Sequence, residues 1–252
     1  MRRVLRAAGD LLLPRVCVAC ARAFDPGEET AGWCADCLGL ISCRAPRCPR
    51  CAREGQATTC PVCLASPPGF SRTLLLGNYA PPLDGVIRAL KFSRQPALAR
   101  ALGEALADHV GPALAAELSR LAAQRPSLAP PRVLAVPISP ERLASRGYNQ
   151  ALLIARAFAA RLGLSVDAGG LARVRPGPPQ SSLDPAARER NARDAYAARI
   201  PPESIAIVVD DVITTGATLS ASARALRDAG AAAVINAVIA RPPHVSRGPG
   251  PP

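Results

Sequence analysis

The most regular apolar pattern in the chain lies near its carboxyl end. Residues 205–209 (Ile-Ala-Ile-Val-Val) form an unbroken, mostly β-branched run, which is typical of a strand covered on both faces of a parallel sheet. Residues 218–229 then place apolar side chains at helical spacing and stop at Gly230, a residue type that commonly ends helices. A strand joined to a helix by a short loop is the repeating unit of α/β folds.

The same alternation of extended and helical patterns continues through most of the chain after residue 70. Further strands are predicted at residues 72–79, 133–136 and 233–240. Further helices are predicted at residues 83–90, 97–109 with a continuation or restart through 121, and 149–162. A loop at 126–131 and a mobile loop or irregular hairpin at 173–198 separate them. These elements predict an α/β fold with a mostly parallel sheet and ligands at the carboxyl ends of its strands.

The cysteines are confined to the start of the chain, before this alternating pattern begins. Nine cysteines lie within residues 17–63, and eight of them form Cys-x-x-Cys pairs: Cys17/Cys20, Cys34/Cys37, Cys48/Cys51 and Cys60/Cys63. Two such pairs complete one tetrahedral zinc site, so the spacing predicts two structural zinc ions in a double zinc ribbon. Joining neighbouring pairs is the simpler arrangement, and an interleaved one stays open. Cys43 is left over, as a free thiol or an alternative ligand.

Other uses of these cysteines fit the sequence less well. Disulfides need an oxidising compartment, and a redox Cys-x-x-Cys motif does not need four copies. The first residues resemble a signal peptide, but Asp10 and Pro14 interrupt their apolar stretch. No apolar run approaches the length of a membrane span. We therefore expect a cytoplasmic protein without a membrane span.

These patterns predict four successive parts of the chain. Residues 1–16 are expected to form a short lead-in helix and residues 17–66 the double zinc ribbon. A Pro-Pro-Gly linker then leads to an α/β domain at residues 70–241. Residues 242–252 are rich in Pro and Gly and are expected to be a disordered tail.

Charge adds a preference for anionic partners. The formal net charge is +12, carried almost entirely by arginine, since Lys91 is the single lysine. Eight zinc-bound thiolates and two Zn²⁺ ions would lower this charge to about +8. An excess of positive charge favours nucleotides, pyrophosphate or nucleic acid as partners, although a composition rich in Ala, Arg and Pro also reflects coding bias. No Ser/His/Asp arrangement for nucleophilic catalysis stands out.

The loop after the 205–209 strand carries the most specific chemistry. Asp210 and Asp211 end the strand, and small hydroxyl residues and Gly216 lead into the next helix. Free amide groups and the helix dipole make such a loop a binding site for phosphate. An acidic pair beside it fits a metal ion or ribose hydroxyls. The alternative is an ordinary Rossmann-like turn whose acids merely cap the helix.

This strand, acid pair and loop resemble the 5-phosphoribosyl-1-pyrophosphate (PRPP) loop of type I phosphoribosyltransferases. The resemblance implies that Asp210 and Asp211 meet the ribose hydroxyls, directly or through Mg²⁺, as the catalytic pair. It also implies a loop that cradles the 5′-phosphate and comprises Val212, Ile213, Thr214, Thr215, Gly216, Ala217 and Thr218.

Four segments narrow the resemblance: 79–92, 136–150, 180–196 and the PRPP-type loop. With the cysteine-rich start, their order is similar to the ComF/GntX family, whose fold is a mostly parallel α/β sheet of the type I phosphoribosyltransferase kind behind a Cys₄ zinc-ribbon module. Tyr148 and Tyr196 stand where that family usually has Phe. The resemblance adds further candidate site residues: Lys91, Ser139, Arg146, Asn149, Gln150, Arg188 and Asn191.

Several of these candidates have simpler structural roles as alternatives. Arg146 and Arg188 can bind phosphate or pyrophosphate bidentately or form surface salt bridges. Asn149 is placed to cap the following helix, and Lys91 can satisfy the last carbonyls of its own helix. Ser139 lies where the resemblance puts a pyrophosphate loop.

The resemblance leaves three functions open. The first is a phosphoribosyltransferase that binds PRPP and Mg²⁺, with an unknown acceptor. The second is an accessory protein of competence and DNA uptake, which binds single-stranded DNA or competence-machinery proteins and uses the PRPP pocket for binding alone. The arginines at 44, 47, 50 and 53 would then contact DNA phosphates, unless they form only a solvated face. The third is a regulator that senses PRPP.

Overall fold

The computed structural model describes residues 15–24, 31–42, 45–174 and 195–243. Most of the expected lead-in helix, Cys43, the candidates Arg188 and Asn191, and nearly all of the expected tail lie outside these ranges. Arg15–Val16 pair with Ala23–Phe24 as the short antiparallel strands β1 and β2, so the expected helix does not extend to residue 16.

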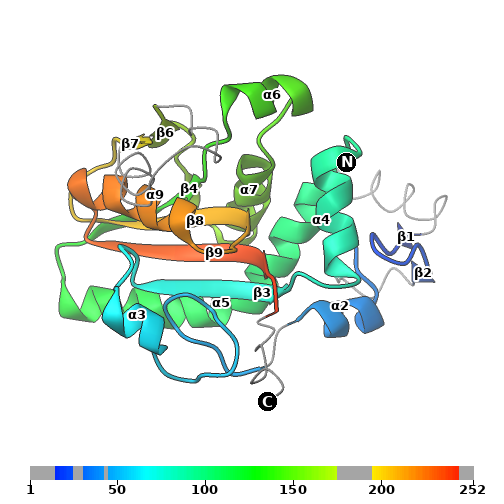
Figure 1. The fold of residues 1–252 in the computed structure, drawn as a ribbon, viewed down its shortest axis with the longest axis horizontal. Helices are drawn as coiled ribbons and strands as arrows, with labels where there is room; N and C mark the ends of the chain where they lie inside the picture. Colours follow the sequence, from blue (N-terminus) through cyan, green and yellow to red (C-terminus); the bar gives the residue numbers. More distant parts are fainter. Residues whose placement is uncertain (1–14, 25–30, 43–44, 175–194, 244–252) are drawn as a thin grey trace, which may run out of the picture.

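A five-stranded sheet forms the centre of the molecule, with the strand order β3-β9-β8-β4-β5 (Figure 1). Every strand pair in it is parallel, which confirms the predicted mostly parallel sheet. The strands are β3 Arg72–Asn78, β4 Ala129–Ala135, β5 Ser165–Val166, β8 Ser204–Val212 and β9 Ala233–Arg241.

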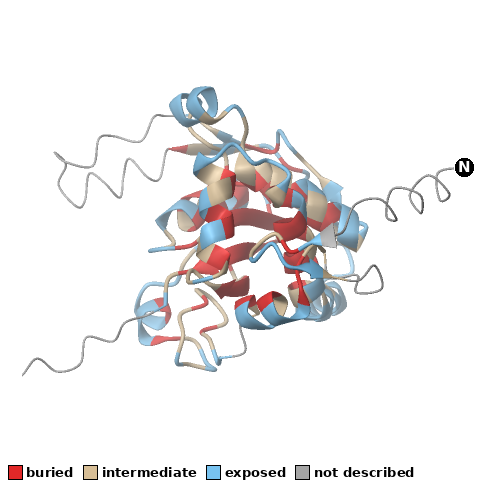
Figure 2. Ribbon diagram, turned by 90° about the vertical axis from the view of Figure 1, so that its right-hand side faces the viewer, coloured by how far each residue is buried: buried red, intermediate tan, exposed pale blue. Residues whose placement is uncertain are grey.

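Helices cover both faces of this sheet because its strands are apolar on both faces. Alternate residues of β8 show the division: Ile207 packs with the cluster under α4, α5 and α7, and Val208 packs with the cluster under α9. Figure 2 shows the resulting buried centre between exposed helix surfaces. The helices are α2 Ala35–Ile41, α3 Pro61–Ala65, α4 Leu83–Phe92, α5 Leu98–Gln124, α6 Pro140–Arg146, α7 Gln150–Leu162 and α9 Ala217–Asp228.

The structure corrects one local prediction and decides between the alternatives of two others. The loop predicted at 126–131 ends earlier than expected, because β4 begins at Ala129. The two prolines of β4 lie where its register with β8 shifts. The long helix does not restart but continues as α5 through Pro112. Strands β6 (Leu171–Arg173) and β7 (Tyr196–Ala198) form an antiparallel hairpin base at the edges of the segment expected to be irregular.

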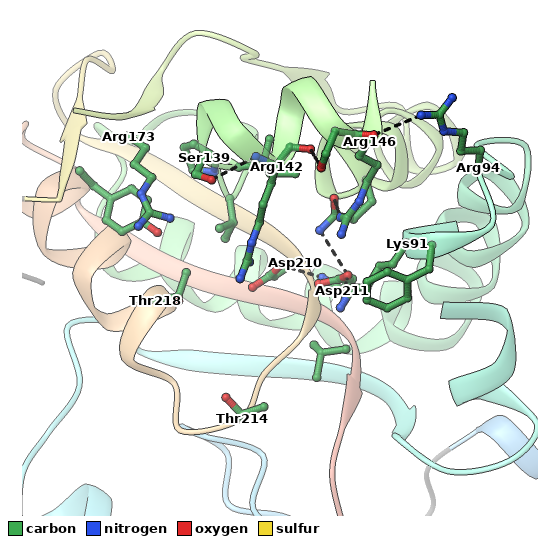
Figure 3. Close-up of a pocket in the computed structure, with 18 residues that line it drawn as sticks. Lys91, Arg94, Ser139, Arg142, Arg146, Arg173, Asp210, Asp211, Thr214 and Thr218 are labelled. Carbon is green, nitrogen blue, oxygen red and sulfur yellow. Dashed lines mark hydrogen bonds and ion pairs between the residues drawn. The ribbon is translucent and has the colours of Figure 1, made fainter. Parts of the chain in front are cut away.

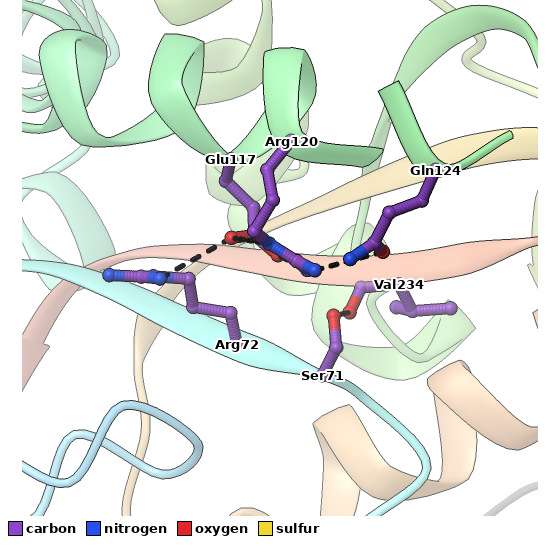
Figure 4. Close-up of polar contacts among 6 residues, drawn as sticks. All are labelled: Ser71, Arg72, Glu117, Arg120, Gln124 and Val234. Atoms are coloured by element: carbon purple, nitrogen blue, oxygen red, sulfur yellow. Dashed lines mark hydrogen bonds and ion pairs between the residues drawn. The ribbon is translucent and has the colours of Figure 1, made fainter. Parts of the chain in front are cut away.

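No helix among the described residues combines the length and apolar character that crossing a bilayer requires. The longest, α5, instead holds a buried carboxylate against the sheet (Figure 4). Glu117 is 6% exposed and bonds Arg120 at 2.6 Å and Arg72 of β3 at 3.4 Å. The side-chain hydrogen bond from Arg120 lowers the pKa of this carboxyl, although burial opposes the shift. The ion pairs thus tie α5 to the edge strand.

The first cysteine segment packs directly onto the α/β core. Trp33, between two cysteine pairs, is fully buried, and its indole N–H donates to the Ala101 carbonyl of α5 at 3.2 Å. At the end of α2, the Ile41 carbonyl lies against Gly77 of β3, where an added Cβ would come within 1.9 Å of the oxygen. The sequence pattern does not reveal this close approach, which requires glycine at position 77.

Gly77→Ala is expected to destabilise the protein, because the methyl group would push α2 away from β3. Overpacking of this kind typically costs about 1–3 kcal/mol. Gly85→Ala is the matched control, since nothing lies within 4 Å of a Cβ at that helical position. There alanine should stabilise the protein by roughly 0.5–1 kcal/mol. Denaturant unfolding of both variants measures the difference, and equal shifts would contradict the packing of α2 on β3.

Candidate functional site

A cavity of about 750 Å³ opens at the carboxyl ends of β4 and β8 (Figure 3). The end of α4, the helix α6 and the hairpin of β6 and β7 complete its walls. Its lining residues are Lys91, Phe92, Arg94, Val136, Pro137, Ile138, Ser139, Arg142, Ser145, Arg146, Gln150, Arg173, Tyr196, Asp210, Asp211, Val212, Thr214 and Thr218. The cavity therefore lies where open parallel sheets bind ligands.

Two carboxylates form the floor of the cavity. Asp210 and Asp211 are 8% and 4% exposed, and an oxygen of Asp210 accepts from the Asp211 backbone N–H at 2.8 Å. The Lys91 ammonium lies 2.7 Å from Asp211. Burial, and next the charge of Asp211, raise the pKa of Asp210 well above its ordinary value. The two neighbouring carboxyls therefore differ: Asp211 has an ion-pair partner in Lys91, whereas the pKa of Asp210 is raised.

This difference predicts opposite stability effects for one substitution at adjacent positions. The pKa of Asp210 is higher in the folded than in the unfolded state, so this carboxyl lowers the free energy of unfolding increasingly as pH rises above 3.8. Asp210→Asn should therefore raise the melting temperature at neutral pH. The gain should vanish below pH 3.8, where both states are protonated. Asp211→Asn should lower the melting temperature, because it leaves Lys91 without its partner. Thermal unfolding from pH 3 to pH 8 tests this, and parallel curves for the two variants would contradict it.

A chain of side chains extends from the acid pair to the rim. The Gln150 amide lies 3.4 Å from Asp211, and the Arg146 guanidinium donates to the Gln150 oxygen. The Arg146 guanidinium also lies over the Phe92 ring, 5.8 Å from its centre. The structure thus brings three of the candidates, Lys91, Arg146 and Gln150, to one wall of the cavity.

The loop into α9 keeps its amides available. Gly216 has φ +85°, a conformation that favours glycine, and no side chain caps the helix that follows. Among the described residues, no acceptor bonds the backbone N–H groups of Thr214, Thr215, Gly216 or Thr218. Unbonded amides at a helix N-terminus are the arrangement that binds phosphate.

The predicted loop residues divide between three surroundings. Thr214, Thr218 and Val212 line the cavity. Thr215, Gly216 and Ala217 line a separate groove beside the second cysteine cluster. Ile213 is 2% exposed and packs into the core. The sequence could not assign these directions, because they depend on how the loop turns.

Two further candidates cap the amino ends of helices. Asn149 caps α7 by accepting from Ala151 and Leu152, and its amide donates to the Val136 carbonyl at 3.1 Å. Both ends of its side chain are therefore engaged away from the cavity lining. Ser139 caps α6 by accepting from the Arg142 N–H at 3.4 Å, and it also lines the cavity.

The structure adds residues that sequence reasoning missed: Phe92, Arg94, Arg142, Arg173 and Tyr196. Figure 3 shows Arg142 reaching from α6 down toward Asp210. The Ser139-Pro140 pair is a typical N-cap and first-turn signal, so it could have predicted α6 and the position of Arg142. Burial raises the pKa of the Tyr196 hydroxyl, which faces this charged surface.

The cysteines form two separate clusters that fit zinc. One contains Cys17, Cys20, Cys34 and Cys37, the other Cys48, Cys51, Cys60 and Cys63, so neighbouring pairs combine as in the simpler prediction. The Cys20–Cys34 and Cys51–Cys60 sulfur distances are 3.8 and 3.7 Å. A tetrahedron with zinc–sulfur bonds of about 2.3 Å has sulfur edges of about 3.8 Å, whereas a disulfide needs about 2.05 Å.

One thiol in each cluster has a lowered pKa, whereas burial raises the pKa of Cys37, Cys51 and Cys63. Burial raises the pKa of Cys17, but backbone hydrogen bonds from Cys34, Cys20 and Ala19 outweigh it and lower that pKa to about 6. The same balance lowers the pKa of Cys48 to about 7.

A second, basic groove of about 500 Å³ lies between the second cysteine cluster and α9. Arg53, Arg224 and Arg241 line it, and no carboxylate is among its described lining residues. The Arg53 Nε is buried and has no hydrogen-bond partner among the residues that the structure describes. Arg47, one of the four arginines expected to contact DNA phosphates, instead forms contacts within the protein. It pairs with Glu54 at 3.4 Å and donates to the Asn78 side chain at 2.6 Å.

Comparison with known proteins gives three related findings. Residues 149–247 match the family described as the phosphoribosyl transferase domain. The DNA utilization protein YhgH of Salmonella typhi is 32% identical over 227 residues, which cover 89% of this chain and 96% of that protein. Competence protein F of Haemophilus influenzae is 30% identical over 205 residues, which cover 79% of this chain and 86% of that protein. These matches confirm the predicted fold class.

One solved structure, that of TT1426 from Thermus thermophilus, is 20% identical to the chain. The match covers 60% of this chain and 86% of TT1426, with a TM-score of 0.34. A superposition this loose adds no argument.

Proposed function

The chain belongs to the ComF family, with the YhgH and competence F proteins and a phosphoribosyltransferase-type domain, and from its site we propose that it binds PRPP with Mg²⁺ and transfers the phosphoribosyl group. One observation carries the proposal. An uncapped helix N-terminus with unbonded loop amides borders the same cavity as a buried pair of carboxylates. Phosphate suits the amides, and ribose hydroxyls suit the carboxylates.

The cavity offers suitable groups for the three parts of PRPP and leaves one end for the acceptor. Figure 3 places Thr218 toward one end, Asp210 and Asp211 in the middle, and Lys91 and Arg94 toward the other end. The 5′-phosphate would accept from the loop amides, and the ribose hydroxyls would donate to the carboxylates. Arg142, which points toward Asp210, would bind the pyrophosphate.

In the transfer, the bond from C1 to pyrophosphate breaks, and pyrophosphate leaves with the electron pair. A lone pair of the acceptor then forms the new bond to C1. The ribosyl centre passes through a cationic state, which the Asp210 and Asp211 carboxylates would stabilise electrostatically. Arg142 and Arg173 would neutralise the charge that develops on the leaving group.

The acid pair fits Mg²⁺ because carboxylate oxygens are its preferred ligands, and an ammonium already lies 2.7 Å from Asp211. Asp210 and Asp211 would hold the ion, which would supply positive charge to offset the negative charge of the bound pyrophosphate. Lys91 would give up its contact with Asp211 when the ion enters and would be free to reach a phosphate oxygen.

Calorimetric titration of the zinc-loaded protein with PRPP, with and without Mg²⁺, tests this proposal. We expect saturable binding that depends on Mg²⁺, and pyrophosphate release when an acceptor is present. Absence of binding under both conditions would refute the proposal. Binding without release for any nucleobase would favour the sensing role over the enzyme.

A second function, binding of single-stranded DNA, is supported by the basic groove. The relatives are named for DNA utilization and competence, and three arginines line a groove without carboxylates among its described residues. Arg241 is 8% exposed and donates to the Cys51 carbonyl at 2.8 Å, so Arg53 and Arg224 are the residues that would bind backbone phosphates. Fluorescence anisotropy with a labelled oligonucleotide should then show affinity that falls steeply with salt. Arg224→Ala should weaken it, whereas Arg156→Ala, a surface arginine outside both the groove and the proposed PRPP cavity, should not.

A further inference from the structure

Phe92 differs from every other aromatic residue of the chain. The sequence has one Trp, three Tyr and four Phe, all within the described residues, and Phe92 alone is exposed. Its side chain is 73% exposed at the rim of the cavity. Single exposed apolar residues are common on protein surfaces, so it is the position at the rim of the cavity that makes this ring a candidate binding contact.

The backbone around this ring is held in place although the ring itself is not buried. The Tyr148 hydroxyl donates to the Leu90 carbonyl, Lys91 pairs with Asp211, and the Arg94 guanidinium lies 3.5 Å from the Ser145 carbonyl. The Arg146 guanidinium covers the ring itself. A phenylalanine has only two side-chain torsions, so on a held backbone its ring can stack with a ligand at little cost in conformational entropy.

The charges near the ring define which ligand would fit. Arg94 and Arg146 lie at this end of the cavity, and the only carboxylates among its described lining residues, Asp210 and Asp211, lie on the floor. Guanidinium groups favour oxo or carboxylate substituents and disfavour a cationic ring. With Arg146 on one side of Phe92, a planar ligand would stack on the other.

We infer that Phe92 forms the acceptor subsite, which takes a planar nitrogen heterocycle with oxo groups, such as a nucleobase. The inference rests on the proposed function, because it assigns the acceptor end of the same cavity. Lys91, the neighbour of Phe92, contacts Asp211, so a ring stacked there would lie next to a ribose held by the acid pair. The base could be free or part of a single strand, since both present the same planar face.

Fluorescence titration tests the inference with three probes: uracil, adenine and an oligothymidylate of about ten nucleotides, a length within the range that single-strand binding sites cover. Phe92→Trp places a fluorophore at the subsite, whereas the single native Trp33 is fully buried. We expect saturable quenching by uracil or by the oligonucleotide, which would identify a free base or a strand as the source. Adenine, without oxo groups, should bind more weakly.

Phe92→Ala should weaken binding of the same probes by roughly 10-fold or more, as base–aromatic stacking predicts. Competition against a labelled probe measures this variant. Leu40→Ala is the matched control, since Leu40 is also 73% exposed but lies on α2, outside the cavity lining.

The outcomes separate this inference from the proposed function. Equal probe affinity for Phe92→Ala and wild type, or no quenching of Phe92→Trp by any probe, would overturn the inference even where PRPP binds. Failure of PRPP to bind the wild type would overturn the proposed function, whatever the probes show. A loss for Phe92→Ala that Phe92→Trp restores would support stacking over a merely structural role.

Discussion

The Asp210→Asn/Asp211→Asn variant is expected to bind PRPP with Mg²⁺ at least about 100-fold more weakly than the wild type. Each carboxylate would lose charge-assisted hydrogen bonds worth about 1.5–3 kcal/mol, and the metal would lose its anionic ligands. The fold should persist, because asparagine keeps the oxygen that accepts from the Asp211 N–H. Calorimetry measures the affinity, and far-ultraviolet circular dichroism checks the fold.

Asp108→Asn is the matched control for this variant. Asp108 pairs with Arg161 at 2.7 Å on the surface, and it does not line the cavity. Its replacement should leave PRPP affinity within about 2-fold, because exposed ion pairs contribute little. Unchanged PRPP affinity in the Asp210→Asn/Asp211→Asn variant would contradict the assignment of the acid pair.

Loss of the first cysteine cluster is expected to destabilise the whole molecule more than loss of the second. Cys17, Cys34 and Cys37 belong to the same apolar cluster as Trp33 and α5, whereas Cys48, Cys60 and Cys63 form a cluster of their own. Cys34→Ser/Cys37→Ser should therefore lower the melting temperature by more than about 10 °C, since structural zinc supplies much of the folding energy of such segments.

Cys60→Ser/Cys63→Ser should lower the melting temperature less, because it loosens mainly the segment around α3. Metal analysis should find two zinc ions per wild-type chain and one in each variant. Cys43→Ser, which removes none of the eight clustered thiols, should keep both ions. Equal effects of the two double variants on melting would contradict the shared core of the first cluster. A wild-type protein without zinc would contradict both sites.

Much of the fold could be predicted because its signals are local. The continuous apolar run of β8, the spacing of the cysteine pairs and the Asn149 cap of α7 each depend on a few neighbouring residues. Short elements gave weaker signals, and the Ser139-Pro140 cap of α6 was the local one available. Strand β5 has two residues, and α6 has no buried residue, so neither produces an apolar period.

The candidate site could be predicted only in part for the same reason. The acid pair and loop are contiguous in sequence, so their pattern was visible. Arg142, Arg173 and Tyr196 come from three separate elements and meet only where those elements reach one end of the sheet. Asn149, a site candidate by resemblance, takes the helix-capping role that was predicted as its alternative, and its amide bonds the Val136 carbonyl.

By itself, the sequence determined where the longer helices and strands form, which cysteines can share a metal and where phosphate chemistry is concentrated, because backbone preference and ligand spacing are short-range properties. Only the tertiary structure decided that Lys91 meets Asp211, that the PRPP-type loop faces both a cavity and a groove, and that Phe92 stays exposed. Those outcomes depend on how the parallel strands bring distant segments together, and that long-range arrangement is not encoded in any single stretch of residues.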